Sequence, residues 1–192
     1  MLSPYKSNFR VTSPQSASRT VLGVTAPHNG IDLVGTDKSI YAVSGGTVVK
    51  SEIITDRNNA SWAFGNRVWI RDTGSRIVCY NHLSVRRVST GQTVKEGDLI
   101  GTEGSSGRST GSHLHFEIRD RLGTGFKALS AAGYLGISNA VQTIVYVPPL
   151  KVNIDWALIV AQRAKLEPQT MAYLKKYKYA EDLLRKLAEA MK

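Results

Sequence analysis

The chain has 192 residues, of which 42% are hydrophobic, and it carries a formal net charge of +10 at pH 7. This composition is typical of a globular protein with one well-buried domain and room for a small second one. A single cysteine, Cys79, excludes an intramolecular disulfide, and no apolar run approaches the length of a membrane span. The excess of basic residues predicts anionic partners.

Residues 1–147 are predicted to form a mainly β, antiparallel domain, because short β-forming stretches alternate with turns rich in Gly, Asn, Asp and Ser. The predicted strands are Ile31–Val34, Ile40–Val43, Gly46–Lys50, Asn66–Ile70, Arg76–Tyr80 and Gln142–Val147, with a further strand from about His113 to Ile118. We expect Cys79 to be a small buried hydrophobic residue in one of these strands.

After Pro148 and Pro149 the pattern becomes helical, and residues 148–192 are predicted to form a small second module. Asn153 is a capping-type residue, Pro168 fits the first turn of a helix, and residues 179–191 have apolar side chains at helical spacing.

All four histidines fall in three short patterns, which are His28-Asn-Gly-Ile-Asp32, Tyr80-Asn-His82-Leu83 and His113-Leu-His115. Imidazole nitrogens with one carboxylate oxygen are ligands that a borderline-soft divalent metal selects. A catalytic zinc ion takes three protein ligands and keeps a fourth position for water. The patterns therefore contain the parts of a catalytic zinc site, which indicates hydrolysis.

The last pattern lies in a stretch that alternates strictly between polar and apolar residues. In a strand, His113, His115 and Glu117 project from one face, and the apolar residues between them anchor the other face in a core. In the first pattern, Asn29 and Gly30 disfavour a helix and suit a bend into a short strand. Such a bend can bring the flanking histidine and aspartate onto one metal ion.

Roughly residues 20 to 120 resemble the lysostaphin/LytM type of zinc metallopeptidase, which cleaves peptide bonds in bacterial peptidoglycan. The resemblance includes the three histidine patterns in the family's order, together with Gly45–Val49, Val94–Gly101 and Thr110–Glu117. It implies that His28, Asp32 and His115 bind Zn²⁺, and that His113 and His82 line the catalytic water and the substrate.

The chain departs from the family pattern in two places. Ser112 stands where the family usually has proline, which we expect to loosen one turn without removing a functional group. The segment after Glu117 matches the family's usual ending only faintly, so no site residues are assigned there.

The resemblance also implies a mechanism. Bound zinc lowers the pKa of water from roughly 16 to roughly 7 and polarises the scissile carbonyl. In this family one imidazole takes the water proton, and the other stabilises the oxyanion and helps to protonate the leaving amine. We assign His113 as the base and His82 as the stabiliser, and the division within the pair stays open. Glu117 either fixes the tautomer of an imidazole or faces solvent.

Two further features of the sequence indicate parts of the site less specifically than the histidine patterns do. The glycine-rich segment Gly101–Gly111 is predicted to be a loop that delivers the catalytic strand and walls the substrate groove. The aromatic residues Trp62, Phe64 and Tyr80 either line that groove or pack in the core.

The predicted function is a zinc-dependent peptidoglycan endopeptidase. One alternative is a non-catalytic wall-binding or regulatory module on the same fold, although such relatives usually lose zinc ligands and this chain retains all of them. A nucleic-acid-binding protein is a third interpretation, but the chain has no motif of that kind and its basic residues are dispersed. Anionic wall polymers are further expected partners.

The expected place of action is the bacterial cell wall. The first ten residues lack the apolar core of a secretory signal, which favours a phage lysin carried in the virion or released at host lysis over a secreted bacterial autolysin. Residues 148–192 would then be a wall-binding or attachment module that uses Lys175–Tyr179, or an appendage packed on the first domain. The sequence determines neither the bond cleaved nor the oligomeric state.

Overall fold

The computed structural model describes residues 3–21 and 23–148, together with residues 170, 183 and 186. Almost all of the predicted C-terminal module lies outside these residues. Its helices and its boundary near residue 148 therefore stay predictions. Within the part of the chain that is described, no helix is long and apolar enough to cross a membrane.

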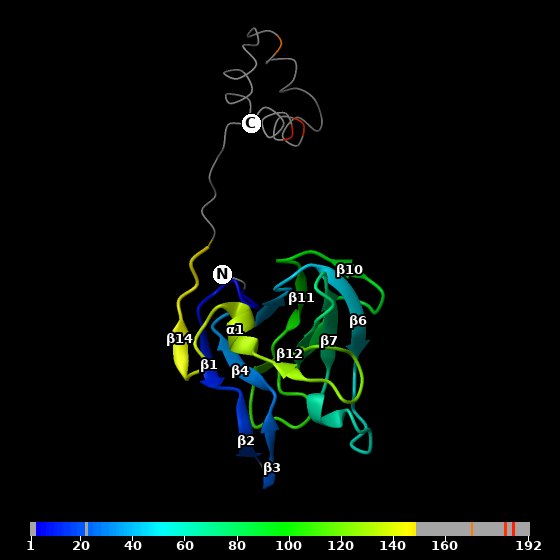
Figure 1. Ribbon diagram of the computed structural model, residues 1–192, viewed down its shortest axis with the longest axis vertical. Helices are drawn as coiled ribbons and strands as arrows, with labels where there is room; N and C mark the ends of the chain where they lie inside the picture. Colours follow the sequence, from blue (N-terminus) through cyan, green and yellow to red (C-terminus); the bar gives the residue numbers. More distant parts are fainter. Residues whose placement is uncertain (1–2, 22, 149–169, 171–182, 184–185, 187–192) are drawn as a thin grey trace. The chain divides into compact units, whose positions relative to one another are not determined.

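The described strands pair antiparallel in three sheets (Figure 1). The largest sheet has the order β10-β6-β7-β8-β12-β4-β1-β14, with β13 paired to β12. Its strands are β1 (Phe9–Ser13), β4 (Gly30–Gly35), β6 (Gly46–Glu52), β7 (Arg67–Asp72), β8 (Ile77–Asn81), β10 (Thr93–Val94), β12 (Leu114–Arg119), β13 (Ala128–Leu129) and β14 (Gln142–Ile144). A second sheet contains β5 (Ser39–Tyr41), β11 (Leu99–Thr102) and β9 (Val85–Arg86), and the third contains β2 (Ser16–Val21) and β3 (Val24–His28).

The mainly β, antiparallel fold is confirmed, and each predicted strand is present with shifted ends. The largest shift is in the last strand, where β14 ends at Ile144 rather than Val147. Two short helical segments were not predicted, namely the 3-10 turn η1 (Trp62–Phe64) and α1 (Ala131–Leu135). The helix α1 begins where the Ser130 hydroxyl accepts a hydrogen bond from the Gly133 N–H.

Strand β12 lies between β8 and β4, and both of its faces are buried. The apolar side chains Leu114, Phe116 and Ile118 belong to the main hydrophobic cluster, as the alternating pattern predicts. The residues that alternate with them project from the other face, where Trp69 and Cys79 form part of a smaller cluster. The central strand therefore carries polar side chains in a buried setting.

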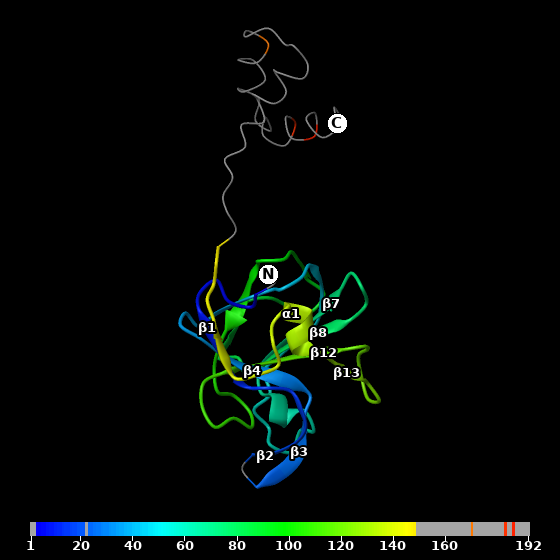
Figure 2. The ribbon, with the colours of Figure 1, turned by 60° about the vertical axis from the view of Figure 1, so that its left-hand side comes forward.

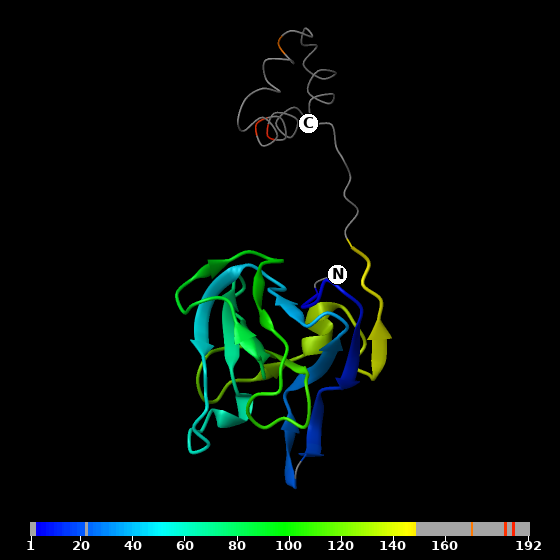
Figure 3. The ribbon, with the colours of Figure 1, turned by 180° about the vertical axis from the view of Figure 1, so that it is seen from behind.

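The β2–β3 hairpin extends away from the rest of the described fold in three views (Figure 1, Figure 2 and Figure 3). Strand β3 leads into β4 with only Asn29 between them. The next residue must be glycine, because a Cβ atom at Gly30 would lie 2.2 Å from the backbone oxygen of Phe116. This close approach lets β4 pair with β12, and the register then places Asp32 opposite His115.

Candidate active site

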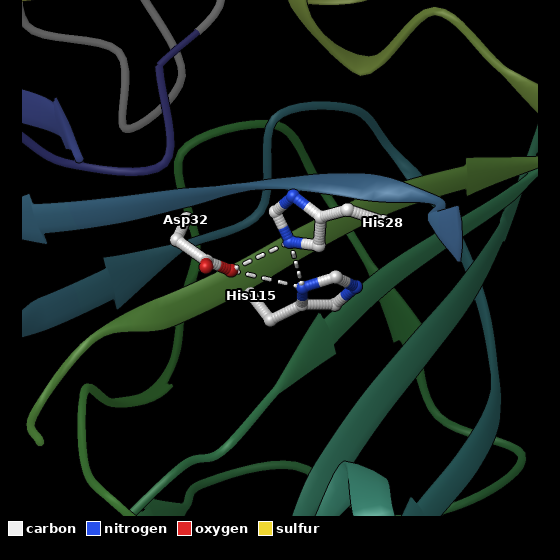
Figure 4. Close-up of side chains that lie close together, drawn as sticks. All are labelled: His28, Asp32 and His115. Carbon is white, nitrogen blue, oxygen red and sulfur yellow. Dashed lines mark hydrogen bonds and ion pairs between the residues drawn. The ribbon is translucent and has the colours of Figure 1, made fainter. Parts of the chain in front are cut away.

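Three of the predicted site residues converge at one point (Figure 4). His28 ends β3, Asp32 lies in β4 and His115 in β12. The Oδ1 atom of Asp32 lies 3.0 Å from both His28 Nε2 and His115 Nδ1, and these two nitrogens are 3.1 Å apart. A zinc ion binds such nitrogen and oxygen ligands at about 2.0–2.2 Å, so one ion can contact all three atoms.

The outer nitrogen of each imidazole in this triad has a partner of its own. The Nδ1–H of His28 faces the Pro14 carbonyl oxygen at 2.8 Å, which leaves the Nε2 lone pair facing the triad. The Nε2 atom of His115 lies 3.5 Å from a Glu117 carboxylate oxygen, which leaves Nδ1 facing the triad. The donor set and its orientation therefore fit a divalent metal ion.

The electrostatics also favour a cation at this point. Burial would raise the pKa of Asp32, but the neighbouring His115 and His28 imidazoles hold it far below its usual range. Burial would lower the pKa of His115, but the Asp32 and Glu117 carboxylates raise it to about 9. A proton or a metal ion is thus stabilised between these buried groups.

The two remaining histidines lie beside the triad. Their rings have centroids 4.7 Å apart, and His113 Nε2 lies 3.6 Å from the Oδ1 atom of Asp32. The Nδ1 atom of His82 lies 2.8 Å from the carbonyl oxygen of Ser106, and that of His113 lies 2.8 Å from the carbonyl oxygen of Gly111. If each Nδ1–H donates to its carbonyl, both Nε2 atoms present lone pairs.

His82 is held in a conformation that costs backbone energy. It follows β8 with φ of 63°, in the left-handed region that non-glycine residues rarely adopt. Its pKa is lowered to about 3, first by burial and then by the nearby His115 and His113 rings, so it is neutral at physiological pH.

Two cavities border this group of histidines. The first, of about 230 Å³, is lined by residues that include Arg19, His28, Phe64, His82, Arg108 and His115. The second, of about 300 Å³, is lined by residues that include Arg19, Asp32, Thr110, Gly111 and His113. The predicted glycine-rich loop thus supplies walls to both cavities through Arg108, Thr110 and Gly111.

Of the three aromatic candidates, one lines a cavity, one lies in the core and the third does neither. Phe64 lines the first cavity. Tyr80 is fully buried in the main core, where its hydroxyl accepts a hydrogen bond from the Val43 N–H. Trp62 lines neither of the two cavities that border the histidines.

Glu117 does not face solvent, so that alternative is wrong. The residue is 1% exposed, and Arg119 donates to both of its carboxylate oxygens at 2.8 and 3.0 Å. The guanidinium of Arg119 lies 3.8 Å from the ring centroid of Phe126 and 4.3 Å from that of Trp69. This arrangement fixes the carboxylate that faces His115.

Two contacts near the site were not predicted from the sequence. Arg19 Nη1 donates to the Oδ2 atom of Asp32 and to Ser13 Oγ, both at 2.6 Å. The hydroxyl of Ser112 donates to Glu103 Oε1 at 2.7 Å, so a hydrogen bond restrains the turn before His113. Each contact joins residues that do not share a strand, so strand periodicity carries no signal for either.

Cys79 is a buried residue, as predicted, and lies in the smaller apolar cluster. Burial, with a contribution from Glu117, raises the pKa of its thiol well above the usual value. A thiol of this kind is a poor nucleophile.

Known proteins resemble this arrangement in sequence and in fold. The family model described as Peptidase family M23 matches residues 26–127. The peptidoglycan DD-endopeptidase ShyC of Vibrio cholerae is 42% identical over 99 residues, which are 51% of this chain and 21% of ShyC. The chain therefore spans well under two thirds of that relative.

Solved structures are similar over most of the described domain. The catalytic domain of lysostaphin from Staphylococcus simulans has a TM-score of 0.55 at 25% identity, over 66% of this chain and 91% of that one. A mutant form of the catalytic domain of the prophage-encoded M23 protein EnpA from Enterococcus faecalis has a TM-score of 0.50 at 31% identity, over 64% of this chain and 88% of that one. The lysostaphin-like fold is confirmed, and the chain belongs to peptidase family M23.

Proposed function

We propose that this protein is a zinc-dependent endopeptidase that hydrolyses peptide bonds in bacterial peptidoglycan. The observation that carries the proposal is the convergence of three ligand atoms within 3.0–3.1 Å of one another, next to two further imidazoles. Membership of peptidase family M23 and the similarity to a peptidoglycan DD-endopeptidase support the substrate class.

His28, Asp32 and His115 would hold the zinc ion, because their lone pairs face one point. When bound there, zinc supplies a lowered pKa for water and a Lewis acid for the scissile carbonyl. Each ligand is at most 9% exposed, so the polypeptide excludes bulk water from the ligand side of the site.

His113 is proposed as the general base and His82 as its partner. The Nε2 atom of His113 is 3.6 Å from the ligand oxygen of Asp32, and its side chain is 14% exposed, so it can exchange its proton with solvent. His113 would take a proton from the attacking water, and His82 would help to protonate the leaving amine. His82 is more deeply buried; its Nε2 lone pair would orient the attacking water, and the imidazole would stabilise developing negative charge once Nε2 carries a proton.

The proposal is tested by digesting purified peptidoglycan of several wall types with zinc-supplemented protein and identifying the new termini by mass spectrometry. New peptide termini from at least one wall type are expected, and the wild-type protein should retain one zinc ion per chain. Intact peptidoglycan in every digest would contradict the enzyme proposal. Salt-sensitive binding to duplex DNA without hydrolysis would support the nucleic-acid alternative.

We further propose that the protein acts at the bacterial cell wall as a phage lysin. The similarity to the catalytic domain of a prophage-encoded M23 protein supports this context. An antibody against the protein should detect it in purified virions or in the lysate after prophage induction. Detection in the medium of uninduced cells would favour a secreted autolysin instead.

A further inference from the structure

The two carboxylate oxygens of Asp32 have different partners. Oδ1 lies 3.0 Å from the triad nitrogens of His28 and His115. Oδ2 lies 2.6 Å from Nη1 of Arg19. The carboxylate therefore presents one oxygen to the triad and the other to a guanidinium on a separate hairpin.

Arg19 is itself fixed in place. Its Nη1 atom also donates to Ser13 Oγ at 2.6 Å, and its side chain is 32% exposed. It pairs with Ala26 in the β2–β3 hairpin, and the same hairpin ends at His28. The hairpin thus carries a triad residue on one strand and a guanidinium that orients another triad residue on the other strand.

We propose that Arg19 is a positioning residue that keeps Asp32 a one-oxygen ligand of the metal ion, an inference that rests on the proposed function. A charge-assisted hydrogen bond occupies Oδ2 and opposes its rotation toward the triad. The Thr12 hydroxyl, 3.2 Å from the Asp32 carbonyl oxygen, restrains the backbone of the same residue. Partners of this kind typically affect metal affinity by about 10- to 100-fold.

Arg19 also lines both cavities that border the histidines. A cation in this place has a competing role, which is to bind a substrate carboxylate directly. The two roles differ in their consequences, because a positioning residue changes metal binding and kcat, whereas a substrate contact changes KM with the metal site intact.

The experiment compares Arg19→Gln and Arg19→Lys with the wild-type full chain. Zinc dissociation constants are measured by competition with a chromophoric chelator, and the visible spectrum of the cobalt-substituted protein reports the coordination geometry. We expect Arg19→Gln to raise the zinc dissociation constant about tenfold, to change the cobalt spectrum and to lower kcat with little change in KM. Arg19→Lys, which retains a charged donor, should lie between Arg19→Gln and the wild type.

Arg108→Gln is the matched control, because Arg108 lines the first cavity and no contact of its side chain with a triad residue is present in the described part of the chain. This variant should bind zinc and show a cobalt spectrum as the wild type does. Wild-type zinc binding and spectrum in Arg19→Gln, or equal weakening in Arg108→Gln, would overturn the inference. A wild-type protein that binds no zinc would instead refute the proposed metal site.

If Arg19→Gln does not fold, as judged by far-ultraviolet circular dichroism, Arg19→Lys carries the test. One atom, Arg19 Nη1, contacts both Ser13 Oγ and Asp32 Oδ2, and a lysine ammonium on its differently shaped side chain would not occupy the same position. A measurable change in its cobalt spectrum would therefore support the inference, and a spectrum identical to the wild type would oppose it.

Discussion

The two halves of the site are held by different parts of the molecule. The proposed metal triad of His28, Asp32 and His115 lies on strands, and its geometry follows from the pairing of β4 with β12. The pair of His82 and His113 is held by backbone carbonyls of the loop between β11 and β12. The proposed metal site therefore depends on the register of a sheet, whereas the orientation of the proposed proton-transfer groups depends on a loop, and we expect that each can be disturbed without the other.

The largest expected effects separate these halves directly. His115→Ala should lose zinc retention and all detectable hydrolysis, because the two protein ligands that remain cannot form the closed part of the site. His113→Ala should retain zinc and lose about 10²- to 10⁴-fold in kcat, because it removes the general base only. Zinc content by atomic absorption and hydrolysis of purified peptidoglycan check both variants. If His113→Ala lost the metal while His115→Ala kept it, the two assignments would have to be exchanged.

His82→Ala is expected to have the next largest effect, a loss of about 10²- to 10³-fold in kcat with zinc affinity unchanged. The substitution also removes the hydrogen bond to Ser106 and replaces a residue in left-handed conformation. His82→Asn tolerates that conformation better and separates the backbone effect from the loss of the imidazole. Equal activity of His82→Asn and the wild type would exclude a role for this imidazole in catalysis.

The resemblance to the lysostaphin/LytM family implied the members of the triad, and local sequence patterns predicted part of its geometry. Strict alternation from His113 onward places His115 and Glu117 on one face of a strand, and the structure shows that face. Asp32 lies near His28 along the chain, and Gly30 between them allows the close approach to β12. These features need only the two-residue period of a strand.

Other parts of the site could not be found in this way, since they depend on side-chain contacts that the strand period does not determine. Arg19 reaches Asp32 from a separate hairpin, and Ser112 reaches Glu103 across the glycine-rich loop. The burial of Glu117 depends on Arg119 and on the aromatic side chains around it. A pattern along one segment does not report which segment will cover it.

Glu117→Gln is expected to have a smaller effect. It tests the proposed metal triad, which lies on strands. The carboxylate lies 3.5 Å from His115 Nε2, so the neutral amide should weaken its hold on the imidazole and raise the zinc dissociation constant about tenfold. Chelator competition measures this change, and kcat at saturating zinc should fall less than in His113→Ala. An unchanged zinc dissociation constant would show that the charge of Glu117 serves only its ion pair with Arg119. The tautomer of His115 would then be fixed by other contacts.

The smallest expected effect concerns Glu103, which anchors the loop before His113 through Ser112. Its fully buried carboxylate accepts hydrogen bonds from the Tyr5 hydroxyl, the Gly35 N–H, Lys38 Nζ and the Ser112 hydroxyl. In Glu103→Gln the amide group cannot accept from every one of these donors, and the free energy of unfolding at pH 7 should fall by about 2 kcal/mol. Zinc affinity should not change, because the hydrogen-bond partners of this carboxylate in the described part of the chain include no triad residue, while kcat should fall a few-fold through the turn that carries His113.

The pH dependence of the same variant distinguishes a charge effect from a packing effect. Burial would raise the pKa of Glu103, but Lys38 and the N–H and hydroxyl donors hold it below its usual range. A lowered pKa in the folded state means that the carboxylate contributes stability above the unfolded value of about 4.3, and this contribution is lost as the pH falls through the folded value. The difference in unfolding free energy between the wild type and Glu103→Gln, measured with urea, should therefore shrink from pH 7 to acidic pH. A difference that stays constant over that range would assign the effect to packing of the side chain, and the loop would then be anchored by shape and not by the charge of Glu103.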